Sequence, residues 1–144
     1  MSLPKKKIIV VSLIVVAFGA ALGTYIVNGL MGHTSPQTFD ETLLSVANET
    51  NKSLPMMIDK ETRLDATMAV AGKRFIYSYT LVNFIKGEVD TSSLRKSIEP
   101  ALIDNYKSNP QMKQFRDEVV ELHYQYKDKK GESLLEIVVN PSAF

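Results

Sequence analysis

The feature that most constrains this chain is an uncharged apolar run near its N-terminus, from Ile8 to Leu30. At about 1.5 Å per residue, the 23 residues of positions 8 to 30 are long enough for a helix to cross a hydrocarbon core roughly 30 Å thick. Lys5, Lys6 and Lys7 precede the run, and basic residues beside a membrane helix remain in the cytoplasm. The sequence therefore predicts a single-pass membrane protein, with its N-terminus cytoplasmic and its C-terminal part exported.

A cleaved signal peptide is the alternative explanation of this run, because Ala17 and Ala21 are small residues of the kind found at cleavage sites. The apolar core of a signal peptide usually has about 7 to 15 residues, whereas this run continues to Leu30, which favours an uncleaved anchor. Gly19 and Gly23 form a GxxxG pair through which two such helices could form a homo-oligomer, although small residues are common in membrane helices anyway. The residues assigned to the anchor are Ile8, Ile14, Phe18, Gly19, Gly23 and Tyr25.

Charge and composition exclude several function classes for the rest of the chain. The sequence has 17 Lys and Arg against 16 Asp and Glu, and setting aside the three N-terminal lysines leaves 14 minus 16, or −2. A slightly acidic domain with dispersed charges lacks the basic surface that nucleic acids require, so no nucleic-acid partner is expected. Cysteine is absent, which excludes disulfides, thiolate metal sites and cysteine nucleophiles.

The chain divides into four segments: a basic tip at 1–7, the membrane helix at 8–30, a linker at 31–37, and an exported domain at 38–144. A single hydrophobic core normally needs on the order of 100 to 150 residues, so the sequence has room for one domain beyond the anchor.

Hydrophobic periodicity predicts the first half of this domain. Thr38 and Glu41 have capping-box spacing, and apolar residues recur every three or four positions until the chain reaches Pro55, so a helix is expected between them. Alternating apolar residues then predict a strand pair at about 62–70 and 74–83.

The second half follows the same order of helix and hairpin. A helical region begins near Asp90 and is expected to kink or split at Pro100, and a short helix begins at Pro110. Strands at 120–126 and 133–139 form the last hairpin. Pairing sequential strands predicts an α+β domain of order α-ββ-α(α)-ββ, with a four-stranded antiparallel sheet packed on helices, although a different strand order is also compatible with the pattern.

The residues of this domain show no grouping that would perform catalysis or bind a metal or cofactor. His123 is the only histidine of the domain, and it lacks partners at metal-binding or acid–base spacing, so it is interpreted as a solvated strand residue. No catalytic residues and no cofactor are therefore predicted. A candidate surface for a partner protein combines an apolar and charged segment before the first strand with residues on the sheet face away from the helices. Its members are Met56, Met57, Asp59, Arg63, Ile76, Val82 and Val138.

Two segments, LPMMIDKETRLD at 54–65 and YSYTLVN at 77–83, resemble a group of small bacterial proteins that are membrane-anchored or exported. The similarity continues through DNYKSNPQM at 104–112 to the final hairpin. The resemblance implies a bacterial inner membrane, so that the exported domain at 38–144 would be periplasmic. It implies neither an activity nor catalytic residues.

These observations predict a non-catalytic membrane protein whose periplasmic domain docks on another envelope protein as an accessory or assembly subunit. A linker of about six residues spans at most roughly 20 Å, so the partner is expected to be membrane-associated as well. The alternative is a domain that binds a small molecule or lipid beside Tyr77, Tyr79, Tyr124 and Tyr126. A hydrolase is the third and least favoured hypothesis.

Overall fold

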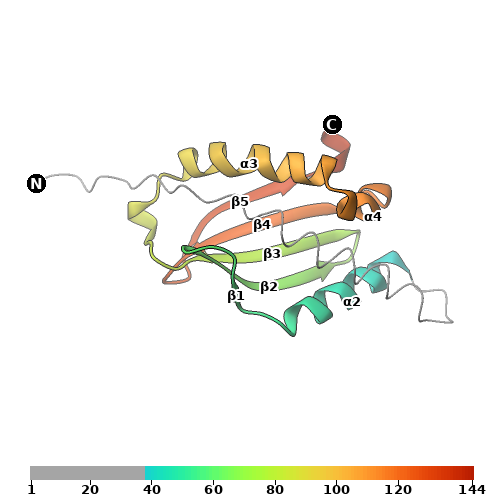
Figure 1. Ribbon diagram of the computed structural model, residues 1–144, viewed down its shortest axis with the longest axis horizontal. Coiled ribbons are helices and arrows are strands. Elements are labelled where there is room, and N and C mark those ends of the chain that lie inside the picture. Colours follow the sequence, from blue (N-terminus) through green and yellow to red (C-terminus); the bar gives the residue numbers. More distant parts are fainter. Residues whose placement is uncertain (1–37) are drawn as a thin grey trace, which may run out of the picture.

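A computed structural model describes residues 38–144 of the chain (Figure 1). Its helices are α2 (Phe39–Asn51), α3 (Thr91–Ser108) and α4 (Lys113–Asp117). Its strands are β1 (Met56–Met57), β2 (Thr62–Val70), β3 (Arg74–Leu81), β4 (Glu121–Asp128) and β5 (Ser133–Val139). Short 3₁₀ turns lie at Lys86–Glu88, Pro110–Met112 and Pro141–Ala143.

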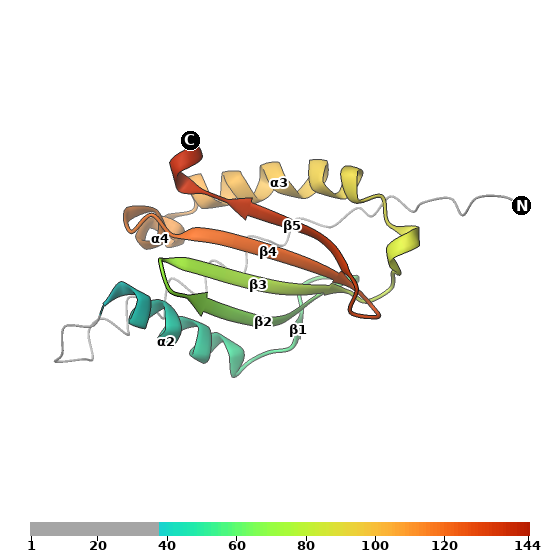
Figure 2. The ribbon, with the colours of Figure 1, turned by 180° about the vertical axis from the view of Figure 1, so that it is seen from behind.

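The five strands form one mixed sheet in the order β1-β2-β3-β4-β5. Neighbouring strands are antiparallel except β3 and β4, which run parallel with Tyr77 opposite Tyr124 and Tyr79 opposite Tyr126. Helix α2 packs along β2 and α3 along β5, so the two long helices lie along opposite borders of the sheet (Figures 1 and 2).

This sheet corrects the predicted four-stranded antiparallel sheet built from two hairpins. Met56 and Met57 pair with β2 and add a fifth strand at the edge. The chain between β3 and β4 spans 82–120 and contains α3 and α4, so it forms a long helical crossover. Such a crossover returns the chain to the end of the sheet where the previous strand began, which makes the next strand parallel. The two predicted hairpins therefore meet through a parallel pair.

Local sequence signals account for the starts of the helices. Thr38 and Glu41 form the predicted capping box: the Thr38 amide donates to Glu41 Oε2 at 2.8 Å, and the Glu41 amide donates to Thr38 Oγ1 at 3.3 Å. Asp90 caps α3 by accepting hydrogen bonds from the amides of Ser92 and Ser93. Helix α3 continues through Pro100 as one helix, and the expected division there does not occur.

The core lies on the face of the sheet that α2 and α3 cover. Apolar and aromatic residues at alternate positions of the central strands point to this face because successive side chains of a strand point to opposite sides. The buried residues of β3, β4 and β5 are Phe75, Tyr77, Tyr79, Leu81, Leu122, Tyr124, Tyr126, Leu135, Ile137 and Val139. Helix α2 contributes Leu43, Val46 and Ala47, and α3 contributes Leu94, Ile98, Leu102 and Tyr106.

The predicted transmembrane helix and the predicted single pass of the inner membrane also need correction. Among the helices between residues 38 and 144, none has both the length and the apolar character needed to cross a membrane. The segment Ile8–Leu30, with the GxxxG pair proposed for homo-oligomers, lies outside the described residues, as do the basic tip and the linker. The fold established by the structure is thus a five-stranded sheet covered by helices on one face.

Candidate functional site: the open face of the sheet

The side of the sheet that points away from the core is its open face. Strand register places four of its residues in a row across β2, β3, β4 and β5, each opposite the next. We call this the central row, and it consists of Met68, Ile76, His123 and Val138. Since neighbouring strands lie about 4.8 Å apart, the row is about 14 Å long. Met68 is 53% exposed and Val138 42% exposed, so the row presents apolar surface to solvent.

A β-bulge determines the direction in which Met68 points. The pairing of β2 with β3 shifts register between Leu64 and Ala66, and Leu64 faces the core. Strict alternation from Leu64 would also turn Met68 toward the core, but the extra residue at Asp65 reverses the direction of the side chains that follow. No residue signal in the sequence marks this bulge, which is why Met68 was absent from the predicted partner surface.

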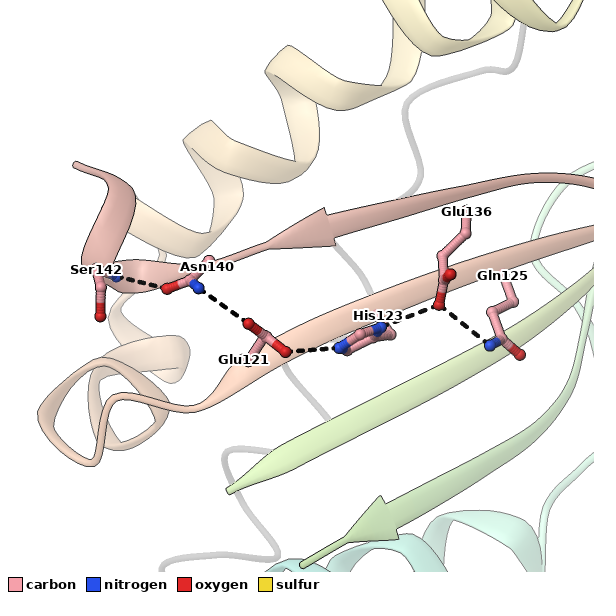
Figure 3. A network of polar contacts seen from close by, with 6 residues as sticks. All are labelled: Glu121, His123, Gln125, Glu136, Asn140 and Ser142. Atoms are coloured by element: carbon pink, nitrogen blue, oxygen red, sulfur yellow. Dashed lines mark hydrogen bonds and ion pairs between the residues drawn. The ribbon is translucent and has the colours of Figure 1, made fainter. Parts of the chain in front are cut away.

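Three side chains of the open face form a Glu–His–Glu cluster of Glu121, His123 and Glu136 (Figure 3). His123 Nε2 lies 2.8 Å from Glu121 Oε1, and His123 Nδ1 lies 3.0 Å from Glu136 Oε1. A neutral imidazole can donate from one nitrogen only, whereas the protonated ring donates from both. With a carboxylate oxygen at each nitrogen, the geometry fits a positively charged His123.

Hydrogen bonds extend this cluster along both strands and into the C-terminal turn (Figure 3). Gln125 Nε2 donates to Glu136 Oε1 at 3.2 Å, and Asn140 Nδ2 donates to Glu121 Oε2 at 2.9 Å. The amide of Ser142 in turn donates to Asn140 Oδ1 at 2.9 Å. The cluster therefore connects β4, β5 and the last residues of the chain on one surface.

The contacts of the cluster shift two pKa values in opposite directions. Partial burial lowers the pKa of His123, but the hydrogen bonds to Glu136 and Glu121 outweigh burial and raise it above its ordinary value of 6.5. The hydrogen bond from His123, and then that from Gln125, lowers the pKa of Glu136 below its ordinary 4.5. His123 lies on the strand face away from the core, but its side chain is only 17% exposed, so it is more enclosed than the predicted solvated strand residue.

Another polar group lies at the far end of the open face. The Arg63 guanidinium pairs with Asp65 Oδ1, and the hydroxyl of Thr80 donates to Asp65 Oδ2. This group ties the bulged part of β2 to β3. Charged side chains therefore lie on both sides of the central row.

Four of the seven residues predicted as a partner surface, namely Met57, Arg63, Ile76 and Val138, lie on the open face according to the strand register. Met56 and Met57 are both exposed residues of the edge strand β1, and Met56 lies opposite Leu64 of the core side. Their role in partner binding stays a prediction.

The other two predicted residues lie at the end of the sheet near β1. Val82 lies one residue beyond the end of β3, where its amide donates to the Glu61 carbonyl at 2.8 Å. Asp59 Oδ1 accepts from the amides of Glu61 and Thr62, both at 2.8 Å, so this carboxylate holds the turn before β2. Asp59 therefore has a structural role in the turn before β2.

Along both outer borders of the sheet, side chains form hydrogen bonds with backbone groups that the strands leave free. On the β2 side, Asn51 pairs with Thr67 as a neighbouring strand would: Asn51 Nδ2 donates to the Thr67 carbonyl and the Thr67 amide donates to Asn51 Oδ1, each at 2.8 Å. On the β5 side, Arg95 Nη2 donates to the Glu136 carbonyl at 2.7 Å. Such contacts hinder pairing with a further strand at these positions, which leaves the open face as the broader surface for a partner.

The four tyrosines considered for ligand binding stack on one another within the core. The rings of Tyr77 and Tyr124 are 5.1 Å apart, and those of Tyr79 and Tyr126 are 5.0 Å apart, with interplanar angles of 10° and 15°. This arrangement follows from the parallel register of β3 and β4. Packing of the rings against one another is therefore sufficient to explain why four tyrosines face the core. The small-molecule hypothesis stays a prediction.

In the part of the chain from 38 to 144, no three His, Asp or Glu residues are grouped so that they could bind a metal ion. The one histidine of this part has a carboxylate at each ring nitrogen, which places it in an ion-pair cluster.

Comparison with solved structures shows where this fold occurs. A crystal structure from Pseudomonas aeruginosa, of a protein provisionally described as secreted, has a TM-score of 0.60 at 17% identity and covers 77% of this chain and 98% of its own. The type 2 secretion system pilotin EpsS from Vibrio vulnificus has a TM-score of 0.56 at 10% identity, covering 72% and 89%. The type II secretion system pilotin AspS from Vibrio cholerae has a TM-score of 0.54 at 10% identity, covering 73% and 91%.

At these identities the likeness establishes a shared fold, and none of the curated proteins matches the sequence. The predicted inner-membrane localisation gains no support from these structures, since one of them is described as secreted. A family model, described as Domain of unknown function (DUF8479), matches residues 38–135, which is most of the part that forms the sheet and its helices. The chain therefore belongs to the DUF8479 family.

Proposed function

We propose that residues 38–144 form a non-catalytic accessory domain of the bacterial envelope that binds another envelope protein through the open face of its sheet. The observation that carries this proposal is the central row, in which the exposed Met68 lies beside the half-buried Ile76 and the exposed Val138 lies on the other side of His123. Apolar side chains surrounded by polar groups are the usual composition of a surface that binds a protein.

The shared fold supports the same function. Two of the solved structures with this fold are pilotins of type II secretion systems, which supports an accessory role for this domain. The side chains at the sheet borders add a geometric argument, because Asn51 and Arg95 occupy backbone groups that a strand from a partner would need. A partner would therefore make its main contacts with side chains of the open face.

Copurification from detergent-solubilised membranes tests the proposal. A tagged full-length chain carrying Met68→Lys should lose its partner, because the new ammonium group would be buried without a counter-charge in the interface. We expect binding to weaken at least about tenfold, which corresponds to about 1.4 kcal/mol.

Leu44→Lys is a matched control. Leu44 lies on α2 and is 51% exposed, close to the 53% of Met68, but it belongs to the helix-covered side of the domain. This variant should retain the partner. Equal loss of binding in both variants, or a partner that remains bound to Met68→Lys, would contradict the proposed interface.

A further inference from the structure

The Glu–His–Glu cluster lies on the surface proposed for the partner, and its net charge depends on whether His123 is protonated. Two carboxylates and one imidazolium give one net negative charge, whereas two carboxylates and a neutral imidazole give two. His123 also belongs to the central row, between Ile76 and Val138. A change of one proton therefore alters the charge in the middle of the open face.

The two carboxylates are anchored unequally. Glu121 has a second contact, with Asn140 at 2.9 Å, and its side chain is 28% exposed. Glu136 receives its hydrogen bonds at a single oxygen, from His123 at 3.0 Å and Gln125 at 3.2 Å, and its side chain is 46% exposed. When the ring can donate from only one nitrogen, Glu136 is therefore the carboxylate with the weaker attachment and the easier access to water.

Cations flank the cluster on neighbouring elements. Arg74 of β3 lies opposite Glu121 in the strand register, and Arg95 of α3 donates to the backbone carbonyl of Glu136. On β4 itself, Lys127 lies beyond Gln125 on the same face. Histidine is the side chain whose ordinary pKa lies near neutral pH, so His123 determines the change in charge.

We infer that the Glu121–His123–Glu136 cluster is a proton-dependent switch on the open face. With His123 protonated, the cluster joins β4, β5 and the C-terminal turn. Loss of the proton releases Glu136 toward solvent and adds one negative charge beside the central row. The effect on partner binding rests on the proposed function, whereas the switch itself is a property of the domain.

The pH range of the switch follows from the direction of its two pKa shifts. The pKa of His123 is raised in the folded state, so its stabilising contribution is complete below 6.5 and disappears as the pH rises through the folded-state value. The pKa of Glu136 is lowered, so its contribution is complete above 4.5 and disappears as the pH falls through its folded-state value. The cluster is fully formed between these limits and opens at higher pH.

NMR titration of the full-length chain tests the switch directly. The imidazole resonances of His123, assigned through their loss in His123→Gln, should titrate with a midpoint above 6.5. Glu136→Gln should lower this midpoint, because an amide oxygen stabilises the imidazolium less than a carboxylate does. Glu132→Gln, in the exposed β4–β5 turn, is the control and should leave the midpoint unchanged.

Amide exchange gives a second measurement of the same event. The side-chain amide of Gln125, which donates to Glu136 Oε1 at 3.2 Å, should exchange several-fold faster above the midpoint, after correction for intrinsic rates, and His123→Gln should remove this step. A His123 midpoint at or below 6.5, or an equal midpoint in the Glu136→Gln variant, would overturn the inference. These measurements need no partner, so failure of the switch is distinguishable from failure of the proposed docking function.

Discussion

At the scale of single residues, the least favourable backbone conformation is that of Val119. Lys73 and Val119 are the non-glycine residues of the described chain with positive φ, at 57° and 56°. Lys73 has compensating contacts, since its amide donates to Asp40 Oδ1 and its ammonium pairs with Glu118, both at 2.9 Å. Val119 is β-branched and 53% exposed, so it bears the steric cost of this conformation with little burial in return.

Val119→Gly should stabilise the domain. Glycine adopts this backbone region without steric cost, and it is the common residue where a helix such as α4 ends. The gain is reduced by the greater freedom of glycine in the unfolded chain, which leaves about 0.5 to 1 kcal/mol. Urea denaturation of the full chain measures the change in the free energy of unfolding.

Val138→Gly serves as the opposite control. Val138 is also exposed, but it lies in the extended strand β5, where glycine weakens the strand. It should therefore lower the free energy of unfolding. If Val119→Gly also lowers the free energy of unfolding, the positive φ of Val119 does not destabilise the domain.

At the scale of the secondary-structure elements, the outer borders of the sheet depend on single side chains. Asn51, at the end of α2, satisfies both backbone groups of Thr67 in the middle of β2. It also accepts from the Thr67 hydroxyl at 3.0 Å. One amide side chain thus attaches a helix to a strand and occupies the position of a neighbouring strand.

Asn51→Ala should destabilise the domain by about 1 to 3 kcal/mol, because it leaves the amide and carbonyl of the buried Thr67 without these partners. Asn51→Asp, which keeps the acceptor but loses the donor, should have an intermediate effect. Faster hydrogen exchange at the Thr67 amide, together with a lower urea midpoint, would confirm the role. An unchanged exchange rate in Asn51→Ala would show that the strand border does not depend on this contact.

The elements also show what sequence can and cannot predict about this fold. The capping box at Thr38 and the alternation around Tyr77 and Tyr124 are local signals, so the first helix and the strand faces follow from them. The parallel pairing of β3 with β4 depends on how a long crossover returns to the sheet, and alternation contains no information about it. The bulge at Asp65 is likewise decided by pairing with β3, and it brings Met68 to the open face.

At the scale of the whole molecule, the candidate site is assembled from strands that are distant in sequence. The proximity of Glu121 and His123 follows from their spacing on one strand, but Glu136 joins them only through the register of β4 with β5. Ile76 and Val138 were predicted to share a surface, and the five-stranded sheet places them in one row with His123 between them. The chemistry of the cluster was therefore not foreseeable from residue types alone.

The architecture assigns different roles to the two sides of the sheet. The side covered by α2 and α3 contains the stacked tyrosines and the apolar core, which provide stability. The open side has exposed apolar residues with charged clusters on both sides of them. At its borders, Asn51 and Arg95 form hydrogen bonds with backbone groups of the outer strands. The central claim is that this open side is the surface that binds a partner.

Site-directed photo-cross-linking in cells that produce the full-length chain tests this claim most directly. A photoreactive residue in place of Met68 or Val138 should cross-link to one and the same envelope protein. The same residue in place of Leu44 on α2 or Lys96 on α3, both exposed, should not cross-link to it. Cross-links from the helix positions alone, or from all four positions equally, would contradict the account.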